Sequence, residues 1–184
     1  GKVVSKIIKE EVKKEVSQIQ GEIPCLHTIL VGDDSASRSY INAKKKACEY
    51  VGMNSEIHKL PIATSQKELE DLILELNDKK EATGILVQLP LPGHLDKYDI
   101  VDLINPLKDV DGFSFFNIAQ LYRGQDCLEP CTPKGILALL DYYNLPLERK
   151  QVVIVGASEI VGKPLSLMMS EPNEKATVTV CHIY

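Results

Sequence analysis

The sequence predicts an α/β fold that is built on parallel sheets and divided into two domains. Two observations lead to this prediction. Short apolar runs alternate with amphipathic segments long enough to cross a sheet, and this alternation is typical of βαβ units. A valine-rich run at 151–155 is followed by a glycine-bounded turn and a second apolar run, which is how a doubly wound nucleotide-binding sheet begins.

The first domain is expected to alternate helices and strands. Apolar residues spaced three and four apart predict a helix over 2–19, and an apolar run over 25–31 predicts a buried strand. Asp34 or Ser35 can cap the helix that follows, and Gly52 can end it. The remaining expected elements are helices over 36–51, 65–77 and 96–104, and strands over 55–62 and 83–89.

The stretch over 105–131 is less regular, and we place a domain junction near 118–131. This divides the chain into domains 1–125 and 126–184. The elements expected beyond the junction are a helix over 133–143, a strand over 151–155, a turn over 156–162, a helix over 164–169 and a strand over 176–181. These elements form half of a Rossmann-like fold, so we expect this domain to be truncated at its C-terminus.

Composition excludes several classes of function. The 184 residues carry a formal net charge of −5 and a pI near 5.4, which argues against binding nucleic acid or an anionic membrane through bulk charge. No apolar run approaches the ~18 residues of a membrane span. The first residues lack the apolar segment of a secretory signal. We therefore expect a cytoplasmic location.

Cysteines and histidines give no metal signature. The five cysteines are odd in number, and we expect reduced thiols. Cys127 and Cys131 lack the second Cys or His pair that a structural zinc site needs. No partner pattern links the four histidines, which are His27, His58, His94 and His182. They are interpreted as core or surface residues, and no metal site is predicted.

The turn over 156–162 is a candidate cofactor site. Its candidate residues are Gly156, Ala157, Ser158 and Gly162. Backbone N–H groups at a helix N-terminus attract phosphate, and glycine allows close approach. The spacing matches neither the G-x-G-x-x-G fingerprint nor a P-loop. A tight strand–helix turn that needs glycine only for packing therefore remains an alternative.

Tyr40 and Lys44 form a second candidate pair. Residues four apart share one face of a helix, so the ring and the amine can reach one pocket. The alternative is a solvated charge run at 44–46. Ala43 and Ala47 beside Tyr40 favour a buried position for the ring. A short-chain dehydrogenase is excluded, because there the tyrosine and lysine follow the glycine turn.

Six stretches in a fixed order resemble the bifunctional methylenetetrahydrofolate dehydrogenase/methenyltetrahydrofolate cyclohydrolase family. They are VGDDSASRSYINAK at 31–44, GILVQLPLP at 84–92, PLKDVDG at 106–112, PCTPKG at 130–135, VIVGASEIVGKP at 153–164 and ATVTVCH at 176–182. The resemblance implies a catalytic N-terminal domain, an NAD(P)-binding C-terminal domain and a homodimer. It also implies two reactions: hydride transfer from 5,10-methylenetetrahydrofolate, then hydrolysis of the methenyl cation to 10-formyltetrahydrofolate.

The resemblance also implies roles for single residues. Lys44 matches the catalytic lysine, and Tyr40 matches the tyrosine that packs against the folate and helps to place the amine. Gln88 matches the glutamine that hydrogen-bonds to the lysine. Asp111 matches the aspartate that binds the pterin, where a carboxylate suits the ring's N–H donors. Asp109 is expected to cap the loop backbone instead.

NADP is the expected cofactor, with NAD as the alternative. Many members of the family carry Arg and Ser where this chain has Ala157 and Ile183, and either polar residue can hold a 2′-phosphate. Two other functions are alternatives. One is a folate-binding relative without dehydrogenase activity. The other is a two-domain dehydrogenase of the shikimate type, against which the stretches at 84–92 and 106–112 argue.

Overall fold

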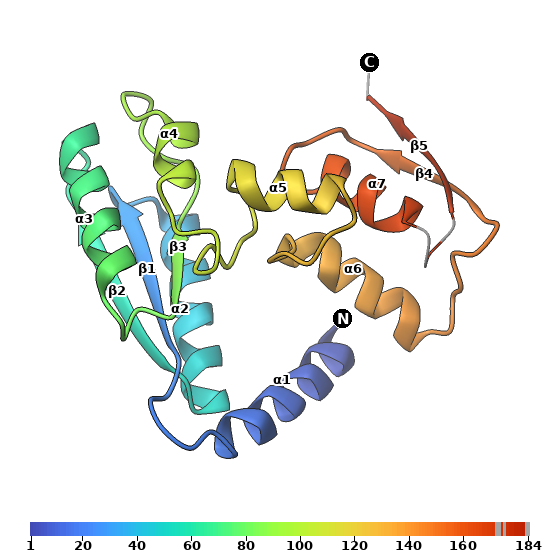
Figure 1. Cartoon of the computed structure of the whole chain (residues 1–184), viewed down its shortest axis with the longest axis horizontal. Helices are drawn as coiled ribbons and strands as arrows, with labels where there is room; N and C mark the ends of the chain where they lie inside the picture. Colours follow the sequence, from blue (N-terminus) through green and yellow to red (C-terminus); the bar gives the residue numbers. More distant parts are fainter. Residues whose placement is uncertain (172–173, 175, 183–184) are drawn as a thin grey trace. The chain divides into compact units, whose positions relative to one another are not determined.

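The computed structural model describes residues 1–171, 174 and 176–182. The chain forms two compact units, Lys2–Asp109 and Val110–Tyr184 (Figure 1). The stretch 110–125, which the sequence-based division gives to the first domain, belongs to the second of these units. The boundary at 125 stays a prediction. Among the described residues, no helix is both long and apolar enough to cross a bilayer.

The Lys2–Asp109 unit contains a three-stranded parallel sheet with the order β2-β1-β3. Its elements are α1 Lys2–Ser17, β1 Cys25–Val31, α2 Ser35–Val51, β2 Asn54–Leu60, α3 Gln66–Asp78, β3 Gly84–Val87 and α4 Lys97–Asp102 (Figure 1). The predicted parallel α/β fold is confirmed. Every helix and strand expected in this unit is present, with ends shifted by a few residues.

Caps define the ends of the helices as the sequence predicts. The Asp34 carboxylate accepts the backbone N–H of Ser37 at the start of α2, and Gly52 ends that helix with φ 84°. Glycine suits this left-handed position because it has no Cβ. Ser65 and Glu68 form a reciprocal capping box at the start of α3.

The core of this unit lies between the sheet and α3. Alternate residues of a strand point to opposite faces, so Ile29 of β1 and Ile85 of β3 face α3, where they meet Leu69 and Ile73. Lys108 ties the end of α3 to the loop that follows α4. Its Nζ donates hydrogen bonds to three backbone carbonyl oxygens at the C-terminal end of α3. The other face of the sheet lies against α2, which contacts β1 and β2.

The Val110–Tyr184 unit contains a two-stranded parallel sheet. Its elements are α5 Phe115–Tyr122, α6 Cys131–Tyr142, β4 Gln151–Val155, α7 Gly162–Ser170 and β5 Thr177–Cys181. Ile154 and Val178 pack on one face of the sheet with Leu147, Leu165 and Met169. On the opposite face, Val153 and Val155 are 61% and 70% exposed.

This unit differs from the sequence prediction in α5 and in where α6 and α7 begin; α6 begins at Cys131, two residues before the predicted 133. Helix α5 lies in the stretch that was expected to be irregular; the Ser114 hydroxyl accepts the N–H of Asn117 and caps it. Helix α7 begins at Gly162, two residues before the predicted start at Pro164. All five cysteines are free.

Candidate active site and relatives

Lys44 and Gln88 meet in the Lys2–Asp109 unit. Lys44 lies in the middle of α2, and Gln88 directly follows the last residue of β3. The Lys44 Nζ donates a hydrogen bond of 3.1 Å to the Gln88 Oε1. The carboxyl ends of parallel strands are where α/β proteins place their ligand sites. The structure therefore brings these two predicted site residues together.

Gln88 is held in one orientation. Its side-chain Nε2 donates to the Leu89 carbonyl at 2.9 Å, and its backbone N–H donates to the Ile29 carbonyl at 2.9 Å. An amide has one acceptor end and one donor end. Because the donor end is taken by a carbonyl, the oxygen end faces Lys44.

The predicted burial of Tyr40 is wrong. Its side chain is 64% exposed, and the buried stripe of α2 passes instead through Ser37, Ile41 and Cys48. These residues are spaced four and seven apart and so lie along one helix face. Lys44 is half-buried. Tyr40 keeps its i, i+4 relation to Lys44, and its ring presents a wide surface to solvent.

The two aspartates of the 106–112 stretch lie in different surroundings. Asp109 is buried beside β3, where it forms an isolated parallel bridge with Ile85. Asp111 belongs to the Val110–Tyr184 unit and is half-buried. The following Gly112 has φ 65°, and a Cβ there would lie 2.2 Å from the Leu128 carbonyl oxygen. Glycine is therefore required beside Asp111.

The glycine turn between β4 and α7 has features both of a tight packed turn and of a cofactor site, the two alternatives that its sequence left open. A Cβ on Gly162 would lie 1.9 Å from the Gly156 carbonyl oxygen, so this glycine is needed for packing. Gly156 has φ 120° and open space around its Cα, which leaves its backbone approachable. The Ser158 Oγ accepts the N–H groups of Val161 and Gly162. A hydroxyl that accepts in this way still has a hydrogen to donate to a phosphate.

The structure describes one of the two positions at which many family members carry a polar residue for the 2′-phosphate. Ala157 is half-buried in the turn and offers no polar side chain. Ile183 lies outside the described residues. The residues present fit a dinucleotide through backbone and hydroxyl groups.

One polar cluster was missed by the sequence analysis. His27, Glu56 and His58 come together on the sheet of the Lys2–Asp109 unit, with their ligand atoms within 4.8 Å of one another. Sequence reasoning treated both histidines as isolated. The signal that links them is the pairing of β1 with β2, which sequence alone does not provide.

Comparisons with known proteins match both parts of the chain. Residues 1–111 match the family described as tetrahydrofolate dehydrogenase/cyclohydrolase, catalytic domain. Residues 130–184 match the corresponding NAD(P)-binding domain. The predicted junction at 125 falls between these matches.

Individual relatives agree with these matches. The bifunctional protein FolD of Nitratiruptor sp. is 48% identical over 187 residues, covering 100% of this chain and 66% of the relative. The crystal structure of the bifunctional FolD enzyme from Campylobacter jejuni is 45% identical with a TM-score of 0.95, over 98% of this chain and 64% of that one. The Trypanosoma brucei FolD, complexed with NADP cofactor and inhibitor, is 34% identical with a TM-score of 0.93, over 99% of this chain and 63% of that one.

The chain spans 66% of the Nitratiruptor relative and 64% of a FolD relative from Methanosarcina barkeri, which is about two thirds of their length. The two family matches, in this order, together with full-length identity near one half, establish its ancestry. The chain belongs to the tetrahydrofolate dehydrogenase/cyclohydrolase family.

Proposed function

We propose that the protein acts in one-carbon folate metabolism. In this proposal it oxidises 5,10-methylenetetrahydrofolate to the 5,10-methenyl cation and then hydrolyses that cation to 10-formyltetrahydrofolate. The observation that supports the second step is the hydrogen bond between the Lys44 Nζ and the oriented Gln88 amide. Family membership supports the pairing of the two steps.

The hydrolysis step needs a group that takes a proton from water beside a cation. A positive charge on the substrate disfavours a second positive charge nearby, so it favours the neutral amine of Lys44. Gln88 Oε1 accepts one amine N–H, which fixes the direction of the nitrogen lone pair. Water then adds to the methenyl carbon, and one of its protons passes to the amine. One carbon–nitrogen bond of the resulting carbinol breaks, the second proton passes to the released nitrogen, and the formyl group stays on the other nitrogen.

The oxidation step needs positioning more than acid or base. Loss of a hydride leaves a cation that is stabilised by two adjacent nitrogens. The exposed ring of Tyr40 offers a flat surface for the bicyclic pterin, and the Asp111 carboxylate would accept its N–H groups. Bound nicotinamide supplies the hydride acceptor.

We propose NADP as the cofactor, with NAD as the rival. Gly156, Ser158 and the start of α7 would hold the pyrophosphate through backbone and hydroxyl groups. A FolD relative binds NADP in its solved structure. Ala157 offers no side chain for a 2′-phosphate, so a preference for NADP would have to arise elsewhere. The homodimer that the resemblance implies and the cytoplasmic location expected from composition stay predictions.

The test of Lys44 compares two lysines on one helix. We expect Lys44→Met to slow methenyl hydrolysis by about a hundredfold or more, which is within the usual range for a general base. Lys45→Met is the matched control, because that exposed lysine pairs with Glu49 and not with Gln88. Decay of methenyl absorbance gives the rate, and folate binding is measured in parallel. Equal hydrolysis by both variants would contradict the role of Lys44.

The test of the oxidation step uses both cofactors. The purified protein is mixed with 5,10-methylenetetrahydrofolate and either NADP or NAD, and nicotinamide reduction is followed. Reduction with NADP and little methenyl build-up supports the full proposal. Reduction with NAD alone reverses the cofactor. Tight folate binding without reduction by either cofactor favours a folate-binding protein that lacks dehydrogenase activity.

A further inference from the structure

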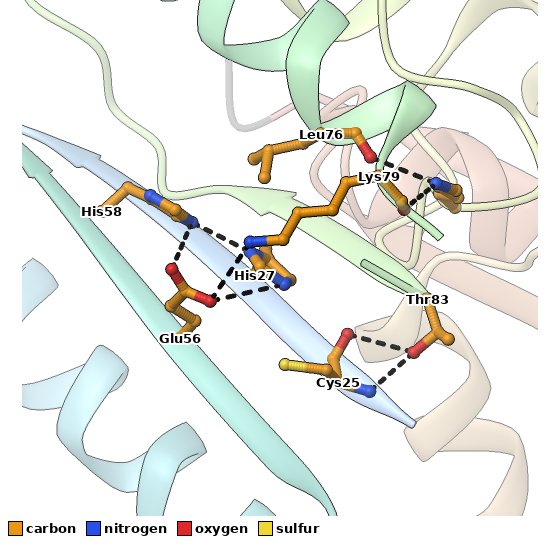
Figure 2. A network of polar contacts seen from close by, with 8 residues as sticks. Cys25, His27, Glu56, His58, Leu76, Lys79 and Thr83 are labelled. Atoms are coloured by element: carbon orange, nitrogen blue, oxygen red, sulfur yellow. Dashed lines mark hydrogen bonds and ion pairs between the residues drawn. The ribbon is translucent and has the colours of Figure 1, made fainter. Parts of the chain in front are cut away.

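A cluster of two histidines and one glutamate lies on two adjacent strands of the Lys2–Asp109 unit. His27 belongs to β1, and Glu56 and His58 belong to β2. In the parallel register, His27 pairs with Glu56, and His58 pairs with Ile29 two residues further along β1. Residues two apart share a face of a strand, so all three side chains point to the same side (Figure 2).

This side is opposite to the proposed active site. Ile29, which pairs with His58, belongs to the core between the sheet and α3. Gln88 follows Val87, another residue of that core, and therefore points to the α2 side, where it meets Lys44. The cluster is thus separated from Lys44 and Gln88 by the sheet itself. Its properties can be measured independently of catalysis.

The nitrogen and oxygen atoms of the cluster converge. The His27 Nδ1 and the His58 Nε2 share a hydrogen bond of 2.9 Å. The Glu56 oxygens lie 3.7 Å from the His27 Nε2 and 3.9 Å from the His58 Nε2. Metal–ligand bonds of 2.0–2.1 Å in a tetrahedral zinc site separate its ligand atoms by about 3.3 Å. The 2.9 Å distance uses the His27 Nδ1 and the 3.7 Å distance the His27 Nε2, and one imidazole offers one nitrogen to an ion. With one ligand atom taken from each residue, the three atoms lie within 4.8 Å of one another, and side-chain rotations that bring them to about 3.3 Å would complete the site.

The cluster is buried on one side and open on the other. The His27 side chain is only 1% exposed, the His58 side chain is 18% exposed and the Glu56 side chain is exposed. His27 and Glu56 line a hollow of about 480 Å³ together with Glu22, Glu81 and Lys79. Glu56 is 51% exposed at its edge, which provides an entry path.

Two neighbouring side chains define the limits of the ligand set. The Lys79 Nζ lies 3.8 Å from a Glu56 oxygen (Figure 2) and competes with an ion for that carboxylate. Cys25 lines the same hollow. Its thiol is not among the three groups whose ligand atoms converge, so Cys25 is left out of the ligand set.

We propose that His27, Glu56 and His58 form a binding site for a divalent transition-metal ion of the zinc type. Two imidazole nitrogens and one carboxylate oxygen supply three ligands, and water supplies the fourth. The ion would link the edge strand β2 to the central strand β1. Its function there would be structural, because the site faces away from Lys44 and Gln88.

The test titrates the metal-free 184-residue chain with Zn²⁺ against a chromophoric chelator, and with Co²⁺ for its visible spectrum. We expect one ion per chain and a thermal midpoint that rises with Zn²⁺ concentration. Glu56→Gln and His58→Gln change partly exposed residues, whereas a change at buried His27 risks misfolding. Each is expected to weaken Zn²⁺ binding more than the roughly tenfold to hundredfold that loss of an outer-shell partner costs.

Two further variants are expected to raise Zn²⁺ affinity or to leave it unchanged. Lys79→Met removes the competing ammonium and is expected to tighten binding. His94→Gln is the matched control, since that imidazole bonds to the Thr64 carbonyl outside the cluster, and it should bind as the parent does. Unchanged Zn²⁺ affinity in His58→Gln and Glu56→Gln, or an equal loss in His94→Gln, would overturn the proposal. So would strong thiolate-to-cobalt charge-transfer absorption, which would assign the ion to cysteines.

Discussion

The two sheets of the molecule are built from similar residues but are buried differently. In β1 the last five residues are all buried, because α3 packs on one face of the strand and α2 on the other. In β4 every second residue is exposed, although four of its five residues are valine or isoleucine. Apolar composition therefore predicts a strand, and the elements that cover it decide how much of each face is buried.

The largest expected effect comes from making the same substitution in both sheets. Val31→Thr, in the covered sheet, loses a methyl group and buries a hydroxyl, which should lower the free energy of unfolding by about 2–4 kcal/mol. Val155→Thr, in the half-covered sheet, places the hydroxyl in water, since Val155 is 70% exposed. Its effect should stay within about 0.5 kcal/mol. Denaturant unfolding followed by circular dichroism measures both.

Equal losses in these two variants would break the comparison. They would mean that the outer face of β4 is as buried in solution as the core face of β1. A larger loss at Val31 alone would show that the difference in cover, rather than in strand sequence, sets the stability of each sheet.

The next largest expected effect concerns Lys108, which holds the C-terminal end of α3 against the sheet. The Lys108 Nζ donates to the carbonyl oxygens of Leu76, Asn77 and Lys79, at 3.1, 2.6 and 2.9 Å. These carbonyls lie at the C-terminal end of α3, where helical N–H partners run out, and the Lys79 oxygen also accepts the Ala82 N–H at 3.2 Å. Lys108→Met should cost about 2 kcal/mol, since hydrogen bonds from a charged group are among the stronger ones.

The matched control for this variant is Lys80→Met. Lys80 is highly exposed and its ion pair with Glu22 spans 3.5 Å at the surface, where such pairs contribute little. If the two substitutions lowered the denaturant midpoint equally, Lys108 would contribute no more to stability than an exposed lysine. The C-terminal end of α3 would then be held to the sheet by its apolar contacts alone.

Much of this arrangement follows from the sequence, and the exceptions have physical reasons. Periodicity and capping residues predict α2 and α3 with their ends, because both signals are local. Helix α5 was missed because its apolar residues are not confined to one stripe; the Ser114 cap was the available signal. The prediction that Tyr40 lies on the buried face of its helix is wrong, because alanines fit either side of a helix and do not identify the buried one. Ile41 and Cys48 mark the buried side.

One part of the candidate sites was predictable from the sequence and another was not. Gln88 is predicted to lie near Lys44 through family resemblance, and their hydrogen bond is observed. The histidine cluster could not be predicted, since it depends on the register of β1 against β2. A shift of one residue would turn His58 to the opposite face from His27. Strand register is a tertiary property that no local pattern in 25–31 or 54–60 encodes.

The smallest expected effect lies at the other end of α3. The Ser65 backbone N–H and hydroxyl both donate to the Glu68 carboxylate, at 2.8 and 2.7 Å, and these bonds lower the pKa of Glu68. A carboxyl whose pKa is lower in the folded state stabilises the fold above its ordinary pKa. That contribution is lost as the pH falls through the lowered, folded-state pKa.

Glu68→Gln should therefore lower the denaturant midpoint at neutral pH and leave it unchanged in acid, where the parent carboxyl is also neutral. Glu75→Gln, an exposed position of the same helix, should show no such pH-dependent loss. The contrast with Lys108 is informative, because one cap is exposed and the other is half-buried. A loss at Glu68 as large as that at Lys108 would mean that the start of α3, and not its closed end, limits how firmly the helix covers the sheet.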